Sequence, residues 1–414
     1  MEEDIKSVSQ LILRHYTDQK STQESLFGKN ARVTPMQEAF AVLFRYLKME
    51  KKSKNLIVSL AEKLEEEIEK EKPAENSPDF NKYLTRKAFC LTVRSNKVGE
   101  NDNVEIDFEL LELALTLLEP IRLSSEAVGV YTQTLNRLAL GFMEKGKYEE
   151  AIKLFKQTIA TFEEFKAAGF DPTEDVMSVR EIFGAKKERS MFYSMIMTFS
   201  NANFHIYDCF GRLKDTKMQL KFAVPRILSE FKQREAAMFE ANKMMTSVLG
   251  SGTGLNLYCI CIPAIAPILK FLIDNRRFAQ IDFLLAALMA KLKRQTVNTD
   301  HSEQILSCLF ALWGMKIVKY SIEARDDPKF VENNPICDDV EVIEEWKDVA
   351  GNDYEKQFPT SVIEEMEELS NVFEKAKFWA IQASEISNPS PFDKTCLEEL
   401  NTLAHDIAKK MVKN

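Results

Sequence analysis

The stretch TQTLNRLALGFMEKGKYEEAIKLFKQTIATFEEF, residues 132–165, decides the fold. Its apolar residues recur three and four positions apart on both sides of Gly146, a spacing that predicts two amphipathic helices. Gly146 interrupts the pattern where the chain has to turn, and glycine is the residue that most often ends a helix. The stretch therefore predicts two antiparallel helices joined by a tight turn.

The same residues match the pattern of a tetratricopeptide unit. The positions of W-x2-L-G-x2-Y and then of A-x3-F are occupied by Leu135, Leu138, Ala139, Phe142, Ala151 and Phe155. We expect the small Ala139 and Ala151 to let the two helices approach closely while the larger apolar side chains fill the seam. Because one such unit cannot bury both of its faces, neighbouring hairpins are expected.

Helical periodicity continues on both sides of this unit. The upstream arms are predicted at 81–95 and 106–120, and the downstream arms at 192–209 with 216–231 and at 255–273 with 278–292. The turns of the downstream hairpins are expected at 210–213, with Gly211, and at 274–277, and a long helix is expected over 301–325. We predict an all-α fold, a right-handed superhelix (solenoid) of antiparallel tetratricopeptide-like helical hairpins with a concave wall of first arms.

Changes in composition and the positions of proline and glycine divide the chain into four predicted segments. N-terminal helices occupy 1–78, a tetratricopeptide-like helical repeat array 79–325, an acidic flexible segment 326–360, and C-terminal helices 361–414. The most apolar run, 255–273, is near the length that spans a bilayer. It contains Lys270, Pro263 and Pro267, so we interpret it as a buried inner helix bent at its prolines and expect no membrane span.

The net charge and the cysteine content indicate the kind of partner and the cellular location to expect. The formal net charge of −9 argues against a general affinity for nucleic acid and favours a basic protein surface as partner. The opening residues are acidic and lack the apolar core of a secretory signal. Seven cysteines, an odd number with no CxxC pair, are typical of reduced thiols, so a cytoplasmic location is expected.

The chain lacks the patterns that carry catalysis or bind cofactors. The four histidines have no metal-ligand spacing, and GSGTG at 250–254 has neither a preceding strand nor a following Lys-Ser or Lys-Thr. No GxSxG elbow is present. We therefore expect no enzymatic activity, no cofactor and no metal site.

The order of several segments resembles the KIF-binding protein family, the kinesin-binding tetratricopeptide proteins. A helix DFELLELALTLLEPIRLS precedes the quoted unit, and KKERSMFYSMIMTFSNANFHIYDCFGRL, PILKFLIDNRRFAQIDFLLAAL and ILSCLFALWGMKIVKYSIEA follow it. The chain is shorter than expected for that family, so it resembles a divergent or shortened member. The resemblance implies a non-enzymatic regulator that wraps a kinesin motor domain, keeps it from microtubules, and is cytoplasmic and cytoskeleton-associated.

Helical geometry alone suggests which polar side chains would line a groove of first arms. They are Gln133, Asn136, Thr198, Asn201 and His205. For each, the alternative is a solvated or interhelix-bonded polar residue. An alternative function is a tetratricopeptide scaffold or co-chaperone that holds a peptide in its concave groove, with Asn136 and Arg137 facing the peptide.

Overall fold

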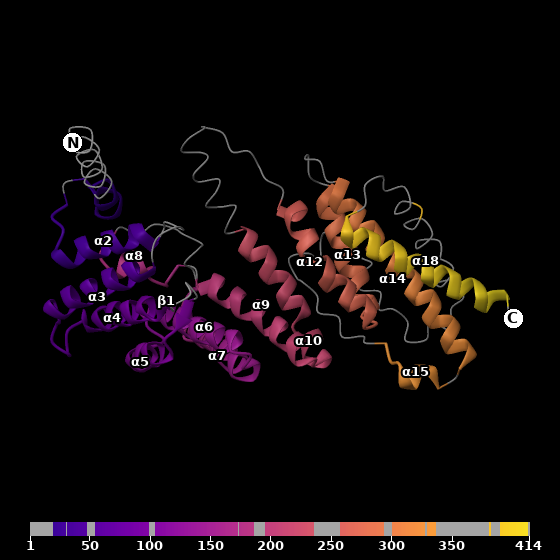
Figure 1. The fold of residues 1–414 in the computed structure, drawn as a ribbon, viewed down its shortest axis with the longest axis horizontal. Coiled ribbons are helices and arrows are strands. Elements are labelled where there is room, and N and C mark those ends of the chain that lie inside the picture. Colours follow the sequence, from indigo (N-terminus) through magenta and orange to yellow (C-terminus); the bar gives the residue numbers. More distant parts are fainter. Residues whose placement is uncertain are drawn as a thin grey trace. The chain divides into compact units, whose positions relative to one another are not determined.

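The computed structural model describes residues 20–29, 31–47, 54–98, 104–172, 174–185, 195–235, 257–293, 300–327, 329–336, 381 and 390–412. Within these ranges nearly all regular structure is helix, which confirms the predicted all-α class (Figure 1). Two compact units divide between Phe222 and Ala223, inside the predicted array of 79–325, where the sequence pattern placed no boundary.

The first unit is a succession of helices. Residues 20–27 are helical. They are followed by α2 (Pro35–Leu47), α3 (Lys54–Lys70), α4 (Phe80–Arg94), α5 (Phe108–Leu118), η1 (Glu119–Ile121), α6 (Val128–Glu144), α7 (Tyr148–Ala167), α8 (Val179–Ile182), α9 (Met195–Leu213) and α10 (Thr216–Lys221). Apart from the short η1 and α8, each helix from α2 to α10 packs against the one that follows it in sequence. In addition, α4 contacts α6 and α6 contacts α9, so alternate helices also touch.

The quoted stretch forms α6 and α7, as predicted. Ala139, Ala151 and Phe155 are fully buried in one cluster with side chains of α9. Gly146 adopts φ 72° between the two helices. Its N–H donates to Met143 O at 2.9 Å while Lys147 N–H donates to Phe142 O at 2.9 Å. This paired arrangement satisfies the last carbonyls of α6 and ends the helix at the predicted place.

A two-stranded ribbon, β1 (Asn96–Val98) and β2 (Val104–Ile106), lies between α4 and α5. The arm predicted at 106–120 is present as α5 and η1, but it starts two residues later than predicted, because Asp107 accepts the Leu110 N–H and starts α5 at Phe108. The ribbon lies close to α6. A Cβ on Gly141 would lie 3.1 Å from Ile106 Cδ1 and 3.0 Å from Phe108 Cζ.

The prediction of a turn at 210–213, with Gly211, is wrong, because these residues belong to a helix. Helix α9 runs through Gly211 and ends at Leu213, and the left-handed residue is Lys214 with φ 58°. Lys214 N–H donates to Gly211 O and Asp215 N–H to Phe210 O, at 3.1 and 3.0 Å. The predicted second arm, 216–231, is interrupted. Helix α10 ends at Lys221 and the chain is helical again over 223–235.

The second unit is organised around one long helix. The described helices of this unit are residues 223–235, α12 (Leu257–Asp274), α13 (Phe278–Lys293), α14 (Asp300–Asp326), α15 (Phe330–Asn333) and α18 (Pro391–Val412). Helix α14 packs against α12, α13 and α18. The buried Trp313 Nε1 donates to Phe278 O at 3.0 Å and so fixes α14 against the start of α13. The α12 and α13 helices and the turn between them confirm the predicted hairpin positions.

The prolines of α12 are accommodated on its outer side. Pro263 and Pro267 are exposed, whereas Ile262, Ile265 and Leu269 are buried. Backbone groups freed by a proline are satisfied most easily where water reaches them. A different helix, α14, is long and apolar enough to cross a membrane by length and composition. Most of its apolar window is buried inside the unit, which accounts for its composition.

The two predicted C-terminal segments lie largely outside the described residues. Of the acidic segment 326–360, the structure describes α15 and its flanks as far as residue 336. Of the helices predicted over 361–414, it describes α18 and Ile381.

Gly146 and Lys214, which follow the ends of α6 and α9, both have a positive φ, so losing a glycine at the first and gaining one at the second should change stability in opposite directions. Gly146→Ala is expected to cost about 1 kcal/mol, because alanine disfavours φ 72° although no atom lies within 4 Å of the added Cβ. Lys214→Gly is expected to stabilise by up to about 1 kcal/mol, because it relieves a positive φ at an exposed position. Urea unfolding of both variants measures the two signs. Destabilisation by Lys214→Gly would contradict the assigned cap.

Candidate partner-binding surface

The side chain of Asn136 joins three helices. Its Nδ2 donates to Thr198 O of α9 at 2.8 Å, and its Oδ1 accepts from Thr158 Oγ1 of α7 at 2.9 Å. All three residues are buried. Both ends of the amide therefore have partners, as a buried amide requires.

The prediction that Asn136 and Thr198 line a groove is corrected by their burial at this contact. Asn136 and Thr198 are 7% and 5% exposed, so neither side chain faces a groove. The Asn136 side chain forms the alternative given for it, an interhelix hydrogen bond, while Thr198 takes part through its backbone carbonyl and its side chain is buried. The physical reason is that α9 packs directly on the flank of α6 from which Asn136 projects.

A second polar contact joins the preceding pair of first arms. The hydroxyls of Thr92 on α4 and Thr134 on α6 lie 2.8 Å apart, at hydrogen-bonding distance. Each is also 2.8 or 2.9 Å from the carbonyl one turn earlier in its own helix. Polar contacts thus link α4 to α6 and α6 to α9, although α5 and η1 separate the first pair in sequence and α7 and α8 separate the second.

The remaining predicted residues keep partial exposure. Gln133 on α6 and Asn201 and His205 on α9 are half-buried. The His205 ring stacks on Phe155 with a centroid distance of 5.4 Å and meets Phe204 edge-on at 5.1 Å. Aromatic packing therefore fixes this imidazole, and the three side chains remain candidates for contact with a partner.

Arg137 has a partner within the first unit. One of its terminal nitrogens donates to Asn96 Oδ1 on β1. Burial lowers the pKa of the guanidinium from its ordinary value, although it remains charged. A long-range contact with the ribbon could not be predicted from a pattern that had no strand at 96–98, so the sequence missed this partner.

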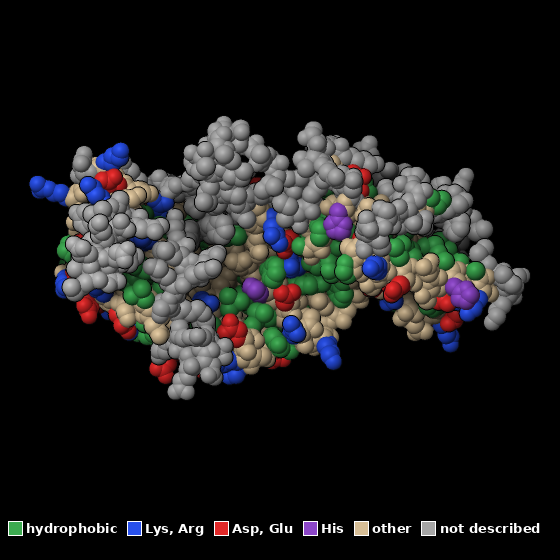
Figure 2. Space-filling view, turned by 45° about the horizontal axis from the view of Figure 1, so that its top comes forward, with side chains coloured by type: hydrophobic (Ala, Val, Ile, Leu, Met, Phe, Trp, Pro, Cys, Tyr) green, Lys and Arg blue, Asp and Glu red, His purple; other side chains and the backbone are tan. Residues whose placement is uncertain are grey.

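Charge is mixed on the face drawn in Figure 2. Among the described side chains there, Lys and Arg are interspersed with Asp and Glu, and hydrophobic side chains lie between them.

The described part of the chain does not bring metal ligands together. No group of three or more His, Cys, Asp or Glu side chains suited to a metal occurs among the described residues. Five cysteines are buried free thiols: Cys90, Cys209, Cys261, Cys308 and Cys396. Burial raises the pKa of Cys308 and Cys396 to about 12, which disfavours the reactive thiolate. The side chains of Cys259 and Cys337 lie outside the described part.

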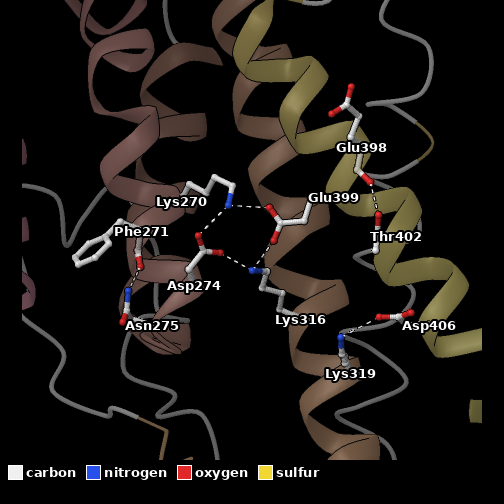
Figure 3. Close-up of polar contacts among 10 residues, drawn as sticks. All are labelled: Lys270, Phe271, Asp274, Asn275, Lys316, Lys319, Glu398, Glu399, Thr402 and Asp406. Atoms are coloured by element: carbon white, nitrogen blue, oxygen red, sulfur yellow. Dashed lines mark hydrogen bonds and ion pairs between the residues drawn. The ribbon is translucent and has the colours of Figure 1, made fainter. Parts of the chain in front are cut away.

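A ring of alternating charges joins three helices of the second unit (Figure 3). Lys270 and Asp274 come from α12, Lys316 from α14 and Glu399 from α18. Lys270 Nζ lies 2.8 Å from Asp274 and 2.7 Å from Glu399, and Lys316 Nζ lies 2.6 Å from Glu399 and also pairs with Asp274. Each charge thus has two opposite neighbours, the arrangement in which partly buried ion pairs offset their desolvation.

The ring also sets the protonation of Glu399. Burial alone would raise its pKa, but hydrogen bonds from Lys270 and Lys316 outweigh that effect, so the pKa is lowered from its ordinary value. Two further pairs, Lys319 with Asp406 and Lys410 with Glu323, both at 3.1 Å, continue the contact along α18. The ring holds α18 in place and has the character of a structural contact.

Comparison with known proteins gives no relative. No family model, no curated protein and no solved structure matches this chain.

Removal of the Asn136 amide tests the three-helix junction. Asn136→Ala is expected to destabilise the chain by about 1–3 kcal/mol, because the buried Thr198 O loses the donor from Asn136 and the Thr158 hydroxyl keeps only its longer contact with Leu154 O. Gln133→Ala, three residues earlier on the half-buried face of the same helix, is the matched control and should change stability by about 0.5 kcal/mol or less. Equal effects in urea unfolding would show that Asn136 does not join the helices.

Acidification should weaken the charge ring. The folded-state pKa of Glu399 lies below its unfolded value, so its contribution to stability is present above about pH 4.3 and is lost as pH falls through the folded value. Glu399→Gln should therefore be less stable than the natural chain at pH 7, and the gap should narrow towards pH 3. Glu398→Gln, at the exposed neighbouring position, is the control. A gap that is constant over this range would contradict the assignment.

Proposed function

We propose that this chain is a non-catalytic protein-binding regulator. Its first unit is a right-handed array of tetratricopeptide-like hairpins, and its partner is a kinesin motor domain whose binding to microtubules it restrains. The proposed site is the wall of first arms, α4, α6 and α9, with Gln133, Asn201 and His205 among its contact residues.

The observation that carries the proposal is the lateral contact between alternate helices. In an array of hairpins, each first arm packs against its own second arm and against the next first arm, and the first arms share one wall. The polar contacts from Thr92 to Thr134 and from Asn136 to Thr198 have this arrangement. The small residues and glycine turn of α6 and α7 add support, because they fit the tetratricopeptide pattern.

The choice of partner rests on the resemblance in segment order and on charge. A kinesin motor meets acidic tubulin with a basic face, and a chain of net charge −9 suits that face. A regulator of this kind acts in the cytoplasm in association with the cytoskeleton.

The co-chaperone alternative has weaker support. A carboxylate clamp needs cations and amides on the first arms that can turn towards a peptide. Asn136 is buried between helices, and Arg137 donates to Asn96. Both would have to leave their partners before they could hold a peptide.

Co-sedimentation with microtubules tests the proposal. The full chain should reduce the microtubule-bound fraction of at least one member of a panel of purified kinesin motor domains. Gln133→Lys combined with Asn201→Lys should weaken this effect about tenfold or more, because two cations would then stand where a basic surface has to dock. Thr116→Lys combined with Ala160→Lys adds the same charge at exposed positions of α5 and α7 and should leave the effect unchanged. No effect on any motor would overturn the proposal.

A further inference from the structure

One end of the first unit collects exposed cations. They lie on the α6–α7 turn, on the outer face of α7, and on the α9–α10 turn and α10, and we call this set the basic edge: Lys145, Lys147, Lys153, Lys156, Arg212, Lys214, Lys217 and Lys221. Four exposed carboxylates lie among these eight cations: Glu144, Glu149, Glu150 and Asp215. The basic edge therefore has more cations than carboxylates, whereas the whole chain has fewer basic than acidic residues, 55 against 64.

The packing brings the two turns to the same end of the unit. Phe142 and Tyr148 flank the α6–α7 turn, and Phe210 and Met218 flank the α9–α10 turn. All four belong to one hydrophobic cluster. Lys156 Nζ of α7 lies 5.7 Å from the centre of the Phe210 ring of α9, which continues the edge from one hairpin to the next.

The cations of the basic edge have no anionic partner in the part of the chain that the structure describes. None of the eight forms an ion pair there, whereas Lys87, Arg94 and Arg122 in the same unit each do. Lys145 and Lys147 lie instead over aromatic rings, with Nζ 3.8 Å from the Phe108 centroid and 5.8 Å from the Phe142 centroid. Aromatic faces hold these two cations in place without neutralising them.

Helix stability does not account for the whole set. Lys145 and Arg212 lie at the C-terminal ends of α6 and α9, where cations are favourable. Lys147 and Lys217 lie at the N-terminal ends of α7 and α10, where the helix dipole disfavours a positive charge. Cations that oppose the dipole and have no intramolecular acid suit a role in binding.

We infer that the basic edge is a docking surface for an acidic protein segment, distinct from the wall of first arms. Rows of carboxylates spaced along an extended chain can reach cations on both turns. A short protein segment is favoured over nucleic acid because the chain carries a net charge of −9, which repels a long line of phosphates beyond the edge, whereas a short acidic segment meets only the edge itself. The surface is also separate from the residues proposed to contact a motor, so the two proposals can fail independently.

Fluorescence anisotropy of the full chain with fluorescein-labelled deca-glutamate tests this surface. Binding is expected at 50 mM NaCl and should weaken several-fold at 200 mM, because salt screens exposed charges. Lys147→Glu, Lys156→Glu, Lys214→Glu and Lys217→Glu together should weaken binding about tenfold or more. The control reverses Lys20, Lys29, Arg32 and Lys63, four exposed cations elsewhere in the unit, and should bind as the natural chain does.

Two further measurements keep the outcome decisive. If the fourfold variant does not fold by circular dichroism, Lys147→Gln with Lys217→Gln replaces it and should weaken binding about threefold. Labelled single-stranded DNA of ten nucleotides is the second probe. Tighter binding of the DNA than of the peptide, absence of peptide binding at 50 mM NaCl, or equal loss in the control variant would each overturn the proposal.

Discussion

The buried amide of Asn136 is the contact on which the first unit depends. It binds a hydroxyl of the second arm of its own hairpin and a carbonyl of the next first arm, so one side chain sets the position of α6 against both α7 and α9. A buried amide with fewer partners would be costly, and this requirement selects one arrangement of the three helices. The polar contact between Thr92 and Thr134 plays the corresponding part between α4 and α6.

Local features of the sequence predicted the hairpin and could not predict its lateral contacts. Ala139, Gly146 and Ala151 act within one hairpin, where sequence spacing determines which side chains meet. Asn136 and Gln133 lie on adjoining flanks of α6, and only the place of α9 decides that the first is buried and the second is not. Periodicity gives a face of a helix but not its neighbour, so two of the predicted groove residues, Asn136 and Thr198, are buried and the other three are half-buried.

Two local errors have specific causes. The ribbon of β1 and β2 was missed because strands of three residues leave almost no alternating pattern. The turn after α9 was placed at Gly211 because glycine is the usual helix terminator, whereas Lys214 takes the left-handed conformation. In the second unit, the ring of Lys270, Lys316 and Glu399 draws on three helices far apart in sequence, and charges on separate helices carry no spacing that could reveal such a contact.

We propose that the first arms, α4, α6 and α9, form one wall that binds a protein partner. Hydrogen–deuterium exchange of the full chain, with and without a kinesin motor domain that it restrains, tests this claim most directly. Protection is expected to increase on binding in peptides of α6 and α9 that contain Gln133, Asn201 and His205, while the exposed faces of α5 and α7 change little. Protection confined to α5 and α7, or no change in α6 and α9, would contradict it.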